Sequence, residues 1–230
     1  MVSGSVRHMR RAITVNAVSI GVATGAYGIS FGAISVASGL DFWQTQALSL
    51  GMFTGASQFA LVGVLGAGGG AIAAVLTAVL LGARNGLYAL SLSQLLQFPR
   101  RWLAPAAQFT IDESTAMALR HEDRALARHA FWATGLSIYV LWNLGTALGA
   151  LGAAALDDPA TLGLDAAIPA GFIALLWPKL VDRTTWAIAL AAAALALALV
   201  PFLQPGIPVL AAASPATRAS ITRLMPVLNV

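Results

Sequence analysis

The sequence contains no cysteine, and only three of its 230 residues are histidines. The absence of cysteine excludes disulfides, thiolate nucleophiles and thiolate-bound metals. His8, His121 and His129 lie in polar stretches, and none has a partner at the spacing of metal ligands. We therefore expect neither a metal site nor a cofactor.

Motifs of membrane-bound enzymes are missing as well. The glycine-rich stretch 66–70 lacks the Gly-Lys-Ser/Thr ending of a P-loop, so the chain is not itself an ATPase. Intramembrane proteolysis would need two aspartates on separate spans, a Ser/His pair or histidine-bound zinc, and the apolar runs contain none of these sets. We expect no enzymatic activity.

Charged residues make up only 10% of the chain, against about 25% in a soluble domain. Hydrophobic residues make up 58%, more than the polar remainder of a soluble protein could cover. The apolar runs lack the alternation of barrel strands and are rich in Ala, Leu and Gly. We predict an all-α polytopic integral membrane protein in the lipid bilayer. It would form a single transmembrane domain, 1–230, with about seven (about six to eight) segments, some short or discontinuous. The candidate segments are 12–40, 44–65, 70–97, 103–119, 131–151, 166–180 and 184–200.

Most basic residues flank apolar runs, where they set orientation, so the net charge of +4 does not indicate a nucleic-acid partner. Arg7, Arg10 and Arg11 precede the first run, which is too long for a signal peptide and is followed by further spans. We predict a retained first span and a cytoplasmic N-terminus.

Arg84 lies near the middle of the run 70–97. An arginine at the centre of a bilayer costs roughly 2.5–3.5 kcal/mol on insertion scales, so its side chain should point into the bundle. Asn85 and Tyr88 follow it on the same run. We assign both, with Arg84, to the candidate substrate-binding and translocation site.

The segment 103–119 is ambiguous, because it is moderately apolar but contains Asp112 and Glu113. If the three spans before it all cross and it is a solvated loop, the arginines of 120–128 lie outside, against the positive-inside rule. If it crosses or re-enters deeply, only the basic pair at 100–101 is misplaced. We therefore predict that the two carboxylates lie within the membrane and that one of them pairs with Arg84.

Three further polar or small residues lie in apolar runs. Gln58 and Asn143 each need a hydrogen-bond partner there, from a neighbouring helix or from a solute. Gly32 lies four residues after Gly28, a spacing that lets helices pack closely. A broken first helix that offers backbone groups to a ligand would use the same glycines.

A weak internal repeat accompanies these features. The triplet Gly-Leu-Asp at 39–41 recurs at 163–165, each time after a glycine-containing run. Transporters often duplicate a half, so we expect a duplicated architecture with halves of about 12–119 and 130–213.

An arginine, an acidic pair and amides in a glycine-rich bundle suit a small zwitterion. Arg84 or the N-terminus of a broken helix could bind a carboxylate. Asp112 or Glu113 could bind an ammonium group or carry a coupling proton, because burial and a nearby arginine shift a carboxyl pKa in opposite directions. A purely structural ion pair between two spans explains the same residues equally well.

Four stretches follow one another along the chain: GISFGAISVASG at 28–39, QALSLGMFTGASQF at 46–59, ARNGLYALS at 83–91 and FTIDESTAMAL at 109–119. In this order they resemble the AzlC family, the large permease subunits of branched-chain amino acid transport systems. The resemblance covers about 15–200. It implies a carrier in the bacterial cytoplasmic (inner) membrane that exports branched-chain or related neutral amino acids, together with a small AzlD-like membrane subunit. The residues that match the family's motif positions are Gly32, Gln58, Arg84, Tyr88, Asp112 and Glu113.

The chain departs from the family pattern at two places. Asn85 and Gly86 stand where the family often has a second basic or polar group, which bears on substrate preference. The stretch 216–223 is polar where family members usually end in an apolar span. The alternatives to a carrier are a non-transporting scaffold or regulatory subunit, and a channel or carrier for another small polar solute.

Overall fold

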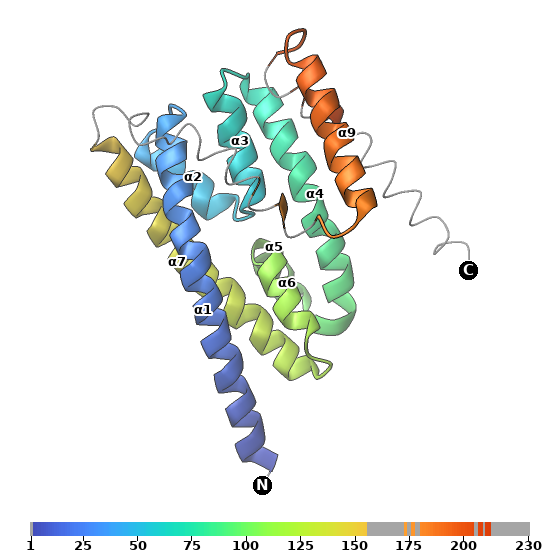
Figure 1. Cartoon of the computed structure of the whole chain (residues 1–230). Coiled ribbons are helices and arrows are strands. Elements are labelled where there is room, and N and C mark those ends of the chain that lie inside the picture. Colours follow the sequence, from blue (N-terminus) through green and yellow to red (C-terminus); the bar gives the residue numbers. More distant parts are fainter. Residues whose placement is uncertain are drawn as a thin grey trace.

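The structure is a computed structural model that describes residues 2–155, 173, 176–177, 180–204, 207–208 and 210–212. Every regular element in these ranges is a helix, as predicted. Three of them are long and apolar enough to cross a membrane, namely α1 (Val2–Ala37), α4 (Ala71–Leu96) and α7 (Arg124–Ala154) (Figure 1). The shorter apolar helix α9 (Arg183–Leu199) matches the predicted segment 184–200 and buries none of its residues. Most of the predicted segment 166–180 lies outside the described residues.

Helices α1 and α7 pack against each other through glycine. A Cβ on Gly28 would lie 2.6 Å from the carbonyl oxygen of Trp142, and one on Gly32 would collide with the carbonyl of Thr146. On α7, a Cβ on Gly149 would collide with the carbonyl of Ile29. Because α1 is continuous, the prediction of a packing groove is confirmed and the alternative of a broken first helix is wrong.

The predicted second span is two helices rather than one. α2 (Phe42–Gly51) and α3 (Ala56–Gly66) are joined through Gly55, whose φ of +63° favours glycine. The hydroxyl of Thr45 donates to Ser35 at 2.9 Å, and a Cβ on Gly66 would lie 2.6 Å from the Ser38 hydroxyl. The hairpin of α2 and α3 therefore begins and ends beside the C-terminal end of α1, and the prediction that 44–65 crosses is wrong.

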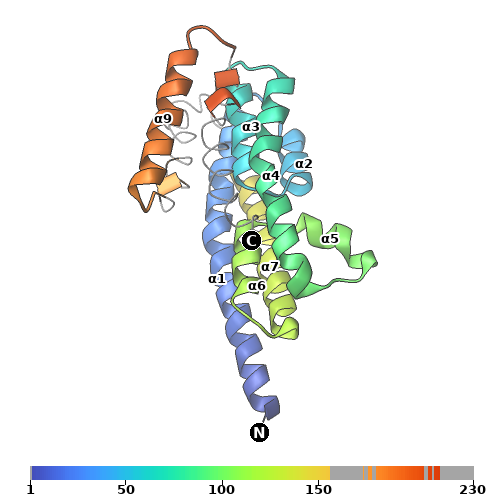
Figure 2. The ribbon, with the colours of Figure 1, turned by 90° about the vertical axis from the view of Figure 1, so that its right-hand side faces the viewer.

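A second hairpin enters from the other end of the bundle. It consists of the 3-10 turn η1 (Arg100–Trp102), α5 (Leu103–Gln108) and α6 (Asp112–Leu119). Arg128 of α7 donates from Nε to the carbonyl of Leu96 at 2.7 Å, which holds the start of α7 at the end of α4. The segment 103–119 is therefore a helical hairpin that enters and leaves at one end, beside α4 and α7 (Figure 2). This is the re-entrant form of the prediction.

The two hairpins correct the predicted distribution of charge. Since 44–65 does not cross, α4 ends at the same end of the bundle as the N-terminus. His129 of α7 lies 3.3 Å from the carbonyl of Arg10, which brings the start of α7 to this end as well. The predicted misplacement of the basic pair at 100–101 is thus wrong, and Asp41 lies at the opposite end. The arginines at the start of α1, in η1, and between the end of α6 and the start of α7 therefore lie at the N-terminal end; they are Arg7, Arg10, Arg11, Arg100, Arg101, Arg120, Arg124 and Arg128.

The connections inside the two hairpins meet between the long helices. The rings of Phe53 and Phe109 are 6.2 Å apart, and the Gln108 amide donates to the carbonyl of Leu50 at 2.8 Å. Both connections contain Phe-Thr, at 53–54 and 109–110, followed by a helix start. The hairpins therefore share a Phe-Thr pair before the second helix and are inverted in direction. This pair lies within the first predicted half, whereas 163–165 lies outside the described residues.

Candidate functional site

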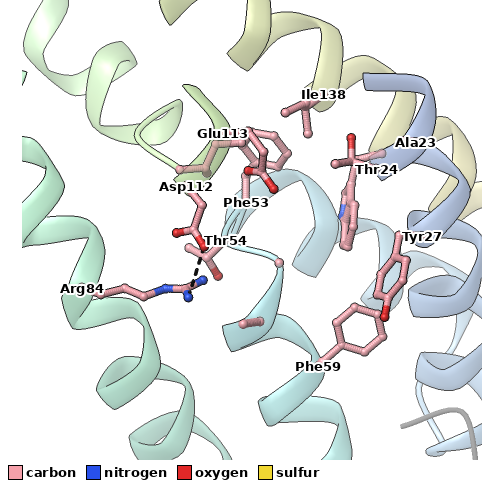
Figure 3. Close-up of a pocket in the computed structure, with 14 residues that line it drawn as sticks. Ala23, Thr24, Tyr27, Phe53, Thr54, Phe59, Arg84, Asp112, Glu113 and Ile138 are labelled. Carbon is pink, nitrogen blue, oxygen red and sulfur yellow. Dashed lines mark ion pairs between the residues drawn. The ribbon is translucent and has the colours of Figure 1, made fainter. Parts of the chain in front are cut away.

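A cavity of about 280 Å³ lies where the two hairpin connections meet. Its wall is built from α1, α4, α7 and the helix starts of α3 and α6 (Figure 3). Most of the wall is apolar. Its large apolar side chains are Phe53, Phe59, Ile111, Ile138 and Trp142. The polar groups are few and come from α1, from the hairpin connections and from α4, which is typical of a site for a small, partly apolar ligand.

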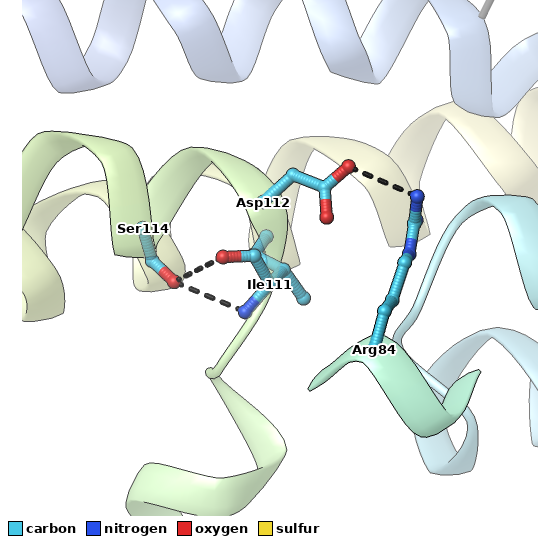
Figure 4. Close-up of polar contacts among 4 residues, drawn as sticks. All are labelled: Arg84, Ile111, Asp112 and Ser114. Carbon is cyan, nitrogen blue, oxygen red and sulfur yellow. Dashed lines mark hydrogen bonds and ion pairs between the residues drawn. The ribbon is translucent and has the colours of Figure 1, made fainter. Parts of the chain in front are cut away.

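The predicted ion pair is present at the edge of this cavity. Arg84 Nη1 lies 3.3 Å from Asp112 Oδ2, and the two side chains are 32% and 35% exposed (Figure 4). The carboxylate neutralises an arginine that lies in the middle of α4, which lowers the cost of placing it in a membrane. The pairing is therefore confirmed, although the two side chains are only partly buried.

Local hydrogen bonds hold Asp112 in this position. It is the first residue of α6, where a negative charge complements the helix dipole. Ser114 Oγ accepts from the backbone N–H of Ile111 at 3.2 Å and donates to the carbonyl of Phe109 at 2.6 Å. Because Ser114 closes the connection onto the first turn of α6, the aspartate projects toward α4.

Several buried polar atoms of the cavity have no hydrogen-bond partner in the described part of the chain. They are Thr54 Oγ1, Arg84 Nε, Asp112 Oδ1 and Trp142 Nε1. Buried polar groups are normally satisfied. A cavity with this much unused hydrogen-bonding capacity fits a polar solute or water, and its apolar wall fits an apolar side chain.

The structure brings only part of the predicted site together. Arg84, Asp112 and Glu113 line the cavity. Tyr88 lies close enough to Arg84 and Asp112 for both charges to act on it. Asn85 is next to Arg84 in the chain, half-buried, and its Oδ1 has no partner in the described residues.

The other predicted residues have structural contacts outside the cavity wall. Gln58 is fully buried, accepts from the Gly55 N–H at 3.1 Å and donates to the carbonyl of Leu48 at 3.1 Å, so it holds the first hairpin closed. Asn143 donates to the carbonyl of Tyr139 on its own helix at 2.7 Å. Gly32 lies in the contact between α1 and α7.

Sequence reasoning missed the aromatic residues of the wall and Thr54. The signal for Thr54 was available, because its Phe-Thr pair recurs at 109–110 directly before the acidic pair. No comparable signal identifies Trp142, whose place in the wall depends on how α7 packs against α1 and α3.

The model of the AzlC family, described as AzlC protein, matches residues 19–156. This range is more than half of the chain, and it contains both hairpins and every residue of the cavity wall. No curated protein and no solved structure matches the chain.

Proposed function

The chain belongs to the AzlC family of membrane proteins, and from this premise we propose that it is the large carrier subunit of an exporter of branched-chain or related neutral amino acids. The family is implicated in branched-chain amino acid transport and is not a family of enzymes. The observation that carries the proposal is the cavity at the meeting point of the two inverted hairpins. It joins an apolar wall to the charges of Arg84, Asp112 and Glu113.

Transport requires that such a site open to one side of the membrane at a time. The two hairpins enter from opposite ends and contact each other through Phe53 and Phe109. Movement of either hairpin against α4 and α7 would open the cavity toward the end from which that hairpin enters. The inverted arrangement thus supports an alternating-access carrier.

A coupling proton would be carried by the acidic pair. Protonation of Asp112 would release Arg84, and solute binding beside the pair would in turn change the affinity of the carboxylate for a proton. This reciprocity is the physical basis on which we propose proton-coupled export.

The orientation and the partner are proposed on separate grounds. The arginines gathered at the N-terminal end support a cytoplasmic N-terminus in the bacterial inner membrane, because positive charge is retained on that side. The AzlD-like subunit follows from family membership.

The test is efflux of labelled leucine, valine and methionine from preloaded cells that express this chain with and without the neighbouring small subunit. We expect efflux above that of empty-vector cells, and the comparison shows whether the small subunit is required. If both chains are inserted at normal abundance without efflux of any of the three, the assignment as an exporter of these amino acids is wrong. A scaffold subunit, or a carrier or channel for another solute, then replaces it.

A further inference from the structure

The second helix of each hairpin, α3 or α6, begins at the same cavity, and the first turns of these two helices differ in charge. α6 begins with Asp112 and Glu113, which neutralise the positive end of its dipole. α3 begins with Ala56 and Ser57 and has no acidic residue in its first turn. At the cavity, acidic side chains therefore neutralise the N-terminus of α6. The N-terminus of α3 keeps its partial positive charge, because no acidic residue of its own first turn neutralises it.

The first backbone N–H groups of α3 have no acceptor within the helix. Helix geometry leaves the N–H groups of Ala56 and Ser57 without an intrahelical partner. Gln58 occupies the N–H of Gly55 alone. Two donors thus remain at a positive helix end, and Gly55 and Ala56 both line the cavity.

A second donor set lies in the same wall. Trp142 is only 5% exposed, lines the cavity and has an Nε1–H without an acceptor in the described structure. The hydroxyl of Thr54, directly before the helix start, is likewise unsatisfied. An indole N–H can only donate, so its missing partner is an acceptor.

The arginine is a weaker candidate for the same acceptor. Arg84 already pairs with Asp112, so an anion that bound to it would have to displace or share that carboxylate. The first turn of α3 carries no acidic residue of its own. An anionic group gains more at the helix end than at the occupied guanidinium.

We propose, on the basis of the proposed function, that the N-terminus of α3 together with Thr54 and Trp142 binds the carboxylate of the transported amino acid. The ammonium group then lies toward Glu113, whose side chain points into the cavity from α6 (Figure 3). The apolar side chain packs against the aromatic wall. The site selects for a free carboxylate through α3 and not through the arginine.

The test measures binding of three probes to the purified full-length protein in lipid nanodiscs by calorimetry. L-Leucine has both charges, L-leucinamide lacks the carboxylate, and 4-methylpentanoate lacks the ammonium group. Trp142→Phe removes the indole donor and keeps a ring. Its control is Trp132→Phe, which changes an aromatic residue outside the cavity wall.

We expect Trp142→Phe to weaken binding of leucine and of 4-methylpentanoate about tenfold and to leave binding of leucinamide within about twofold, because a hydrogen bond to a charged group is lost only for the carboxylates. Thr54→Val gives a second measurement of the same kind. Its control is Thr134→Val, which removes another buried hydroxyl without a partner, outside the wall. The control variants should bind all three probes as the wild type does.

Equal loss for leucine and leucinamide in both cavity variants would overturn the carboxylate assignment. So would unchanged leucine binding in both. In either case the wild type still binds leucine, so the proposed function stands. Absence of binding of leucine, valine and methionine by the wild type, with or without the small subunit, would instead refute the proposed function and this inference with it.

Discussion

Arg84 and Asp112 lie 28 positions apart in the chain, and their side chains meet at 3.3 Å because a hairpin that does not cross the bundle carries the aspartate to the middle of α4. The guanidinium comes from a long apolar helix, and the carboxylate from the first position of a short one. A movement of the hairpin would break the pair without disturbing α4.

The first prediction separates a site pair from a structural pair. Arg84→Gln and Asp112→Asn should each lower leucine efflux at least tenfold, because each leaves one charge without its partner in the cavity. The unpaired charge should also lower the abundance of each single variant. The double variant removes both charges, so we expect its abundance to equal that of the wild type while its efflux stays low. Arg101→Gln, an exposed arginine away from the cavity, is the control. Recovery of efflux together with abundance in the double variant would show that the pair only supports the fold.

A second prediction concerns the contact between α1 and α7. Gly149→Ala places a methyl group against the carbonyl of Ile29, so the helices must separate, at a cost of about 1–3 kcal/mol. Gly152→Ala, on the same helix, places its methyl group in open space and should leave the melting temperature unchanged or raise it. Thermal unfolding of the purified variants measures the difference. Equal melting temperatures would contradict the close packing of these helices.

A third prediction tests the backbone of the first hairpin. Gly55 has a positive φ and open space around its Cβ position, so Gly55→Ala costs about 1–3 kcal/mol through strain alone. Gly51→Ala also meets open space, in a helical conformation, and serves as the matched control. We expect lower thermal stability and lower efflux only for Gly55→Ala. If the two variants behave alike, the chain does not turn at Gly55 in this way.

A fourth prediction tests the topology, and the absence of cysteine makes it direct. Single cysteines at His8 and Arg101 should react with a membrane-impermeant maleimide only in inverted vesicles, and one at Asp41 only in intact cells. All three positions are exposed, so accessibility does not bias the comparison. Labelling of the position 101 cysteine from the same side as the position 41 cysteine would mean that 44–65 crosses after all.

The sequence was sufficient to predict the elements that depend only on the length and composition of one apolar run. The long runs became α1, α4 and α7 because composition and length determine a long apolar helix. A close helix contact through the glycines of α1 and the partner of Arg84 were also predictable, because the glycine spacing and the unpaired arginine are visible in the sequence. The identity of the partner helix, α7, was not predicted.

The hairpins were harder, and the error had a single physical origin. The run 44–65 is long and apolar enough for a span, so hydropathy cannot distinguish one crossing helix from two half-length helices that return. The difference lies in the φ of Gly55 and in the closure by Gln58, which reaches both the N–H of Gly55 and the carbonyl of Leu48. Counting one extra crossing reversed the predicted side of the turn after 44–65 and of the basic pair at 100–101, while the predicted sides of the N-terminus and of Asp41 were unaffected.

The sequence by itself determined the class of this protein, its long helices and the pairing of Arg84 with a carboxylate. Long apolar runs must be buried in a bilayer, and an arginine within such a run needs a counter-charge, so both features follow from the residues alone. Only the tertiary structure decided that the two Phe-Thr connections meet. That meeting places the uncompensated N-terminus of α3 and the indole of Trp142 in the same cavity as the acidic start of α6. Such contacts depend on chain reversals, which bring together groups that no local pattern connects.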